Sequence, residues 1–174
     1  MTDDRGQIAA PRRIGGDRCA VRSHAEMGRN LADVRIVISG YYGFSNAGDD
    51  AILLASIPLI RASHPDATIS VVTYPGADLA KVYASTGLTA IDGSDIAHVD
   101  QIIAAADLLL IGGGGLIQDY LPSDRTHLVR SDHNNLTFWL SLAVMAHAHG
   151  IPVSAWMVGI GPLTTDRGRE DASL

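Results

Sequence analysis

Short apolar runs alternate with longer, mixed segments along most of the chain. The strand-like runs cover residues 34–39, 68–73, 89–91, 107–111 and 152–158. Segments with helical character lie between them, at residues 51–60, 77–85, 96–106 and 136–149. Regular alternation of strands with helices favours a parallel sheet with right-handed crossover connections. We therefore predict an α/β, doubly wound, Rossmann-like domain with strand order 3-2-1-4-5, in which Pro58 kinks or ends the first helix.

A glycine-rich segment follows three of the predicted strands. The three segments are 40–48 (GYYGFSNAG), 112–115 (GGGG) and 159–162 (GIGP). Glycine suits positions where the backbone takes a positive φ or approaches a ligand closely. Loops that follow parallel strands emerge at one edge of the sheet, where α/β proteins bind ligands. The pattern therefore predicts a single ligand-binding crevice bordered by all three loops.

The composition narrows the classes of function. The chain has 174 residues, is 47% hydrophobic and carries a net charge of −6, with a single lysine at Lys81. An acidic domain of this kind lacks the basic face that nucleic-acid binding needs. No apolar run reaches the roughly 18 residues of a membrane span, and we find no secretory signal. Cys19 stands alone, which fits a reducing compartment. We expect a cytoplasmic protein, with peripheral association at the inner membrane face left open.

The two ends of the chain differ from its middle. Residues 1–32 have no strand or helix period, so we predict a disordered tail ahead of a domain at residues 33–165. A further crossover helix should begin after Pro162, yet few residues remain. We therefore expect residues 166–174 to be a truncated polar end.

The first glycine segment lacks the signatures of the common nucleotide-binding loops. Its spacing is neither G-x-G-x-x-G nor that of a P-loop, so we expect no nicotinamide or flavin cofactor. Its backbone N–H groups, around Gly43 and Gly48, can meet a polar ligand. Asp49 and Asp50 follow at its end, where they could cap the next helix. The alternative is that Asp49 or Asn46 binds sugar hydroxyl groups.

The other two glycine segments leave similar alternatives open. Gly113, Gly114 and Gly115 indicate close backbone approach, either to a ligand or to a neighbouring segment. The side chains of Gln118 and Asp119 either contact the ligand or cap a helix. No Cys or His cluster has metal-ligand spacing, so we expect no metal.

Residues 119–134 form a long polar segment that could act as a mobile lid. Arg125 and Arg130 lie in it beside His127 and His133. Together they could hold an anion, or they could belong to a solvated loop.

Taken in order, the three glycine segments resemble the N-terminal half of the polysaccharide pyruvyl transferase family, in particular its bacterial cell-wall branch. Gly40–Ala51 is similar to the family's G-Y-Y-G-x-x-N-x-G-D-E-A. Asp107–Asp119 is similar to D-L-x-I-x-G-G-G-G-L-x-Q-D, and Val158–Pro162 to Q-G-I-G-P. Asp50 replaces a usual Glu, and Val158 replaces a usual Gln.

The resemblance implies one half of a two-domain GT-B-type enzyme that transfers pyruvate from phosphoenolpyruvate to a sugar as a ketal. In this family the residues that handle the donor lie in the C-terminal half. We therefore expect an N-terminal fragment that faces a sugar or a lipid-linked polysaccharide acceptor, and phosphoenolpyruvate binding only if a C-terminal domain is supplied. The alternatives are a non-catalytic half completed by a separate chain, and the N-domain of a GT-B glycosyltransferase. We assign no catalytic residue; the expected substrate-binding residues are Gly43, Asn46, Gly48, Asp49, Gly113, Gly114, Gly115, Gln118, Asp119, Gly159 and Gly161.

Overall fold

The computed structural model describes residues 33–74, 77–78, 86–119 and 136–173. The predicted disordered tail at residues 1–32 lies outside the described residues, as do most of the predicted helix at 77–85 and both Arg125 and Arg130.

The described chain forms one parallel sheet with helices on both of its faces. The strands are β1 (Arg35–Ser39), β2 (Thr68–Thr73), β3 (Thr89–Asp92), β4 (Leu108–Ile117) and β5 (Val153–Ile160). The helices are α1 (Ala47–Ser63), α3 (Ile96–Ala104), α4 (Leu136–Ala148) and α5 (Asp166–Asp171). Every strand pair is parallel and the order is β3-β2-β1-β4-β5, which confirms the predicted doubly wound sheet.

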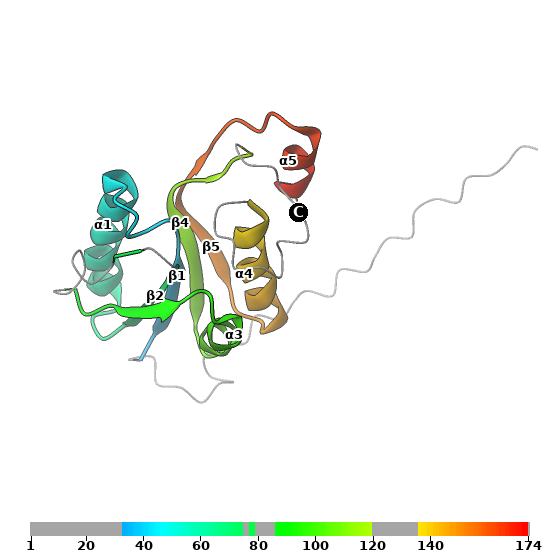
Figure 1. Ribbon diagram of the computed structural model, residues 1–174. Helices are drawn as coiled ribbons and strands as arrows, with labels where there is room; N and C mark the ends of the chain where they lie inside the picture. The colour runs from blue at the N-terminus through cyan, green and yellow to red at the C-terminus, as the bar shows by residue number, and fades with distance from the viewer. Residues whose placement is uncertain (1–32, 75–76, 79–85, 120–135, 174) are drawn as a thin grey trace, which may run out of the picture.

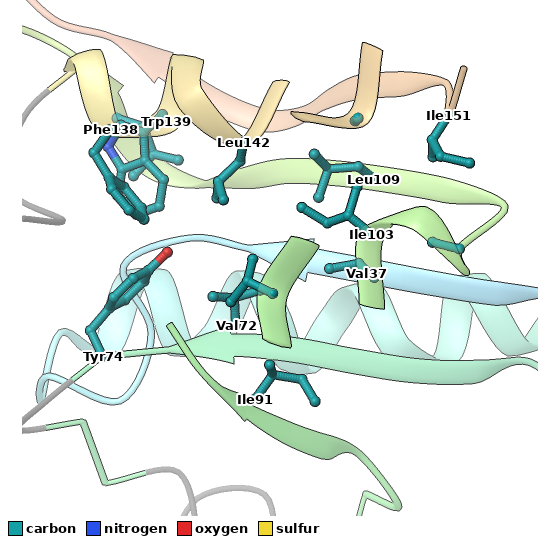
Figure 2. Packing of buried hydrophobic residues seen from close by; sticks show 14 residues of the cluster. Val37, Val72, Tyr74, Ile91, Ile103, Leu109, Phe138, Trp139, Leu142 and Ile151 are labelled. Carbon is teal, nitrogen blue, oxygen red and sulfur yellow. The ribbon is translucent and has the colours of Figure 1, made fainter. Parts of the chain in front are cut away.

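The sheet has α1 on one face and α3 and α4 on the other (Figure 1). Two apolar clusters, one on each face, hold these helices in place. The alternation of side chains in β1 explains the division, since Ile36 and Ile38 join the cluster under α1 whereas Val37 joins the other. Figure 2 shows the second cluster, in which strand residues such as Leu109 meet Ile103 of α3 and Leu142 of α4. A strand that is buried on both faces has a continuous run of apolar residues. The sequence therefore predicted β1 without any knowledge of the fold.

The first helix does not end at Pro58, which was one of the two outcomes predicted for it. It continues from Ala47 to Ser63 with Pro58 inside it. Pro58 and Leu54, whose carbonyl loses its helical partner, both lie on the exposed side of α1. Water can therefore satisfy that carbonyl, which lowers the cost of an internal proline.

The predicted loop after the fourth strand is part of the strand itself. We expected the strand to end at residue 111, but β4 continues through all four glycines to Ile117. Pairing with β5 holds it there, with Gly112 opposite Trp156 and Gly114 opposite Val158. The fifth strand is also longer than predicted, because β5 reaches Ile160 and so includes Gly159.

The segment after Pro162 forms a helix where a further one was expected to begin. Thr165 is the N-cap of α5 and its hydroxyl accepts the N–H of Gly168 at 2.9 Å. Figure 1 shows α5 beyond the end of the sheet at which β4 and β5 finish, on the same side as α4.

A groove of about 470 Å³ lies on the α1 face, near the starts of the strands. Its walls include Val34 of the segment before β1, Leu108 of β4, Pro152 before β5 and Leu59 of α1. This is the end of the sheet opposite to the glycine segments. Open α/β sheets bind ligands beyond the carboxyl ends of their strands, so the candidate site is the opposite edge, where the glycine segments lie.

Candidate functional site at the carboxyl edge of the sheet

The three glycine segments meet around the second half of β4. β1 pairs with β4 up to Ser39 opposite Ile111, so the loop after β1 emerges beside Gly112. β5 pairs with β4 on its other side as far as Ile160. The sheet order therefore places the first and third segments on either side of the second one, the tetraglycine Gly112–Gly115.

The loop after β1 is tied down by hydrogen bonds of its own backbone. The N–H of Gly43, at φ 82°, donates to Asp50 Oδ1 at 2.8 Å, and the carbonyl of Gly43 accepts the N–H of Asp78 at 2.8 Å. Ser45 has a positive φ of 62°, which is uncommon for a residue with a side chain. The loop is thus held in one conformation that leads directly into the start of α1.

Asn46 and Asp49 form a hydrogen-bonded pair at the start of α1. The Asn46 Oδ1 atom caps the helix by accepting the N–H of Gly48 at 3.2 Å. The Asn46 Nδ2 atom donates to Asp49 Oδ2 at 2.6 Å. Within the described part of the chain, this leaves one N–H of Asn46 and the Oδ1 atom of Asp49 without a hydrogen bond. Helix capping therefore leaves the Asn46–Asp49 pair with one hydrogen-bond donor and one acceptor that a ligand could use.

Asp49 lies in the contact between α1 and β4. The residue is buried, at 7% exposed, and its carboxylate rests against the α-carbon of Gly114. Burial raises the pKa of Asp49 above the ordinary value for aspartate, and the Asp50 carboxylate raises it further. Burial and the nearby Asp49 charge also raise the pKa of the Tyr42 hydroxyl.

Neighbouring side chains leave no room for a Cβ at two glycines of the tetraglycine. A Cβ on Gly113 would overlap the ring of Tyr42, and one on Gly114 would overlap the Asp49 carboxylate. Both glycines have φ of 87°. The Tyr42 hydroxyl donates to the carbonyl of Gly112 at 2.6 Å and so joins the first loop to β4. Of the two alternatives left by the sequence, packing accounts for Gly113 and Gly114.

Gly115 differs from the glycines before it. It is exposed, and a Cβ placed on it would meet nothing closer than Gln118 Oε1 at 3.4 Å. Its φ is not in the left-handed region. Gly115 and the half-buried Gln118 are therefore the part of the motif that borders solvent at this edge.

Asp119 connects the end of this segment to α5. Its carboxylate accepts the Thr165 N–H at 2.6 Å, the Thr165 hydroxyl at 2.8 Å and the Thr164 hydroxyl at 3.2 Å. Backbone and side-chain hydrogen bonds from Thr164 and Thr165 lower the pKa of Asp119 to about 2. The carboxylate is thus engaged in holding the start of α5, and a Cβ on Gly168 would overlap it.

The third segment packs along β4. A Cβ on the exposed Gly159 would lie 3.3 Å from the α-carbon of Gly115. The N–H of Gly161 donates to the carbonyl of Ile117 at 2.8 Å, and a Cβ there would lie 2.9 Å from Gln118 Cβ. Gly48, in the first segment, is exposed, and the nearest side-chain atom to a Cβ placed on it would be Asn46 Oδ1 at 3.5 Å. The structure therefore brings all the named residues of the three segments to one edge.

Sequence reasoning missed the residues that connect the segments. Tyr42 and Thr165 make the contacts described above but were not singled out, and the hydrogen bond from the Gly43 N–H to Asp50 was not foreseen. A signal existed for Tyr42, because a tyrosine that is buried needs a partner for its hydroxyl. Nothing in the sequence, however, shows which of Tyr41 and Tyr42 is buried.

Within the part of the chain that the structure describes, no group of three or more His, Cys, Asp or Glu side chains could hold a metal ion. Among the described helices, none is both long and apolar enough to cross a membrane.

Comparison with known proteins identifies the family. A search of curated proteins found no match to the chain. The family model described as polysaccharide pyruvyl transferase matches residues 46–173, from the Asn46–Asp49 pair to the end of α5. This match spans most of the chain and includes the tetraglycine, Asp119 and the third segment. The chain therefore belongs to the polysaccharide pyruvyl transferase family.

Proposed function

We propose that this chain supplies the acceptor-facing half of an enzyme that transfers pyruvate from phosphoenolpyruvate to a sugar of a cell-wall or extracellular polysaccharide. The family assignment supports the chemistry. The single observation that carries the acceptor role is the Asn46–Asp49 pair, with its remaining donor and acceptor.

This pair matches a sugar hydroxyl group. A hydroxyl both donates and accepts, so it can give its hydrogen to Asp49 Oδ1 and take the free N–H of Asn46. A hydrogen bond to a carboxylate is stronger than one between neutral groups. The pair therefore favours a polyhydroxylated ligand over an anionic one, since an anion would be repelled by Asp49 and Asp50.

The rest of the proposed site is mostly backbone. Gly115 of β4 and Gly159 of β5 are exposed to solvent, and Gln118 and Gly161, each just beyond the end of its strand, are half-buried. Gly43, Gly48, Gly113, Gly114 and Asp119 shape the site by packing and hydrogen bonding rather than by offering free groups. We place the sugar over Gly115 with one hydroxyl at the Asn46–Asp49 pair.

The donor needs a different environment. Phosphoenolpyruvate carries a carboxylate and a phosphate, which call for cationic partners. We propose that a second domain of a GT-B-type enzyme supplies most of these, and that Arg125 and Arg130 add anion contacts from this half. Because phosphoenolpyruvate is a cytoplasmic metabolite, we propose that transfer occurs in the cytoplasm, at the inner membrane face if the acceptor is lipid-linked.

Two binding measurements on the full chain test this proposal. In saturation-transfer NMR we expect the methyl glycosides of glucose, mannose and galactose to include at least one that binds, and Asn46→Ala to weaken it. By calorimetry we expect phosphoenolpyruvate to bind this chain more weakly than about 100 μM. No binding by any glycoside contradicts the acceptor role, and tighter phosphoenolpyruvate binding shows that the donor site lies in this half.

A further inference from the structure

We propose that residues 27–32, just ahead of the sheet, lie in the apolar groove on the α1 face and cover it. This groove is at the opposite end of the sheet from the glycine segments, so its occupant is independent of the proposed sugar site. Residues 27–32 lie outside the described residues, and they end the tail for which the sequence predicts disorder.

The groove is mostly apolar, and a hydrogen bond fixes one of its walls. Trp156 of β5 forms this wall, and its indole N–H donates to Ser56 Oγ of α1 at 2.7 Å. The bond ties the ring to the helix, so Trp156 is not free to turn and fill the groove. Leu59 of α1 forms another wall and is 53% exposed. An exposed apolar hollow of this kind is typical of a docking surface.

The chain enters the sheet at this groove. Val34, the residue before β1, is itself a wall residue, and its carbonyl accepts the N–H of Thr68 at 2.9 Å. Residues 27–32 are therefore joined to the wall through Asp33 alone. A segment on so short a tether has an effective concentration of about millimolar, so it can occupy a site that a free chain would bind weakly. This favours a segment of the same chain over a separate partner.

The length of the segment matches the width of the groove. The walls run from Val34 beside β1, past Leu108 of β4, to Pro152 beside β5. Neighbouring strands are about 4.8 Å apart, so the groove crosses about 10 Å. Three or four extended residues cover this distance. Residues 27–32 are long enough to reach β5, and their two large apolar residues, Met27 and Leu31, supply the side chains that enter the groove.

The tail and the rest of the chain carry opposite charges. Residues 1–32 contain six arginines and four acidic residues, whereas the remaining residues contain seven basic and fifteen acidic ones. Asp107 lies in the groove wall, where its Oδ2 atom accepts the Arg35 N–H at 2.8 Å. Arg29 is the arginine of the tail that is nearest to the groove along the chain. Attraction between the two charges places Arg29 on the side of the groove where Asp107 lies.

NMR of the full chain tests the contact directly. Its two tryptophans lie on opposite faces of the sheet, Trp156 in the groove and Trp139 in the cluster under α3 and α4. We expect nuclear Overhauser effects between the Leu31 methyl groups and the Trp156 indole ring, and none to the Trp139 ring. Leu31→Ala should shift the Trp156 indole N–H signal. Ile14→Ala, in the same tail but outside the docked segment, should leave that signal in place.

Two leucines of α1 provide a matched pair for the energetics. Leu54 and Leu59 are both exposed, and of the two only Leu59 lines the groove. We expect Leu31→Ala to lower the thermal midpoint by about 2 °C or more. Combined with Leu59→Ala it should lower the midpoint by less than the sum of the single shifts, because both changes remove the same contact. Combined with Leu54→Ala it should give the sum.

Each result either supports the proposal or overturns it. If the Leu31–Trp156 effects are absent, or if the L31A and L59A shifts simply add, residues 27–32 do not lie in the groove. If the Trp156 signal changes on dilution of the protein and L31A leaves it unchanged, a second copy of the chain occupies the groove instead. The expected contacts should persist on dilution, because a tethered segment docks independently of protein concentration.

Discussion

At the scale of single residues, Gly114 of β4 packs directly against Asp49 at the start of α1. The Asp49 carboxylate occupies the space that a side chain would need, and the backbone of Gly114 lies at φ 87°. An L-residue there meets both a steric overlap and an unfavourable conformation. The next residue, Gly115, has neither constraint.

We therefore expect Gly114→Ala to lower the free energy of unfolding by about 2 kcal/mol or more. Gly115→Ala should leave it unchanged or slightly raised, because alanine restricts the unfolded chain more than glycine does. Urea denaturation of the two variants checks this. Equal stability of the two variants would show that the Asp49–Gly114 contact does not constrain the strand.

At the scale of elements, Asp119 determines how the end of β4 is joined to α5. Its carboxylate accepts hydrogen bonds from both residues that precede α5, and Thr165 is the cap of that helix. A helix this short, at six residues, gains little from its own backbone. Its position therefore depends on the connection to Asp119.

The lowered pKa of Asp119 predicts a dependence of stability on acid. Its folded-state pKa of about 2 lies below the value in the unfolded chain, so its contribution is complete above about pH 4 and is lost as the pH falls toward 2. Asp119→Asn should lower the thermal midpoint by a few degrees at neutral pH, and this difference from the wild type should shrink between about pH 4 and about pH 2.

Asp166→Asn is the control for this experiment. Asp166 lies in the first turn of the same helix, and its ion pair is with Arg169 on an exposed surface. Exposed ion pairs contribute about 0–1 kcal/mol, so D166N should change the midpoint little. A midpoint difference for D119N that stays constant down to about pH 2 would contradict the proposed role of its charge.

At the scale of the whole molecule, the sheet separates two cores that do not share side chains. Ile36 and Ile69 belong to the cluster beneath α1, whereas Ile103 belongs to the cluster beneath α3 and α4. The backbone of the sheet lies between them. Substitutions in different clusters should therefore act independently.

Removal of one methylene tests this separation. Ile69→Val and Ile103→Val should each lower the free energy of unfolding by about 0.5–1.5 kcal/mol, and their double variant should equal the sum within about 0.5 kcal/mol. Ile36→Val with Ile69→Val is the comparison pair, because the two residues lie opposite each other in β1 and β2. That pair should depart from additivity more than the first. If the Ile69→Val and Ile103→Val pair departs from additivity more than the comparison pair, the two faces of the sheet are energetically coupled.

The sequence by itself determined the alternation of strands and helices, the strand order and the family. The strands next to the centre are buried on both faces, so their apolar runs are visible without any knowledge of the fold. The three glycine segments and their order carried the resemblance that the family model later confirmed, over residues 46–173.

Only the tertiary structure decided how the glycine segments are used. A run of four glycines has no local preference for a strand, and it forms one here because β5 pairs with it on one side. Asp49 and Asp50 are adjacent and chemically alike, yet one rests against Gly114 while the other holds the Gly43 N–H. The contact of Asp49 with Gly114, like that of Tyr42 with Gly112, joins residues more than sixty positions apart in the chain. A local pattern can predict that a segment is buried, but the partner that buries it is set by the packing of the whole sheet.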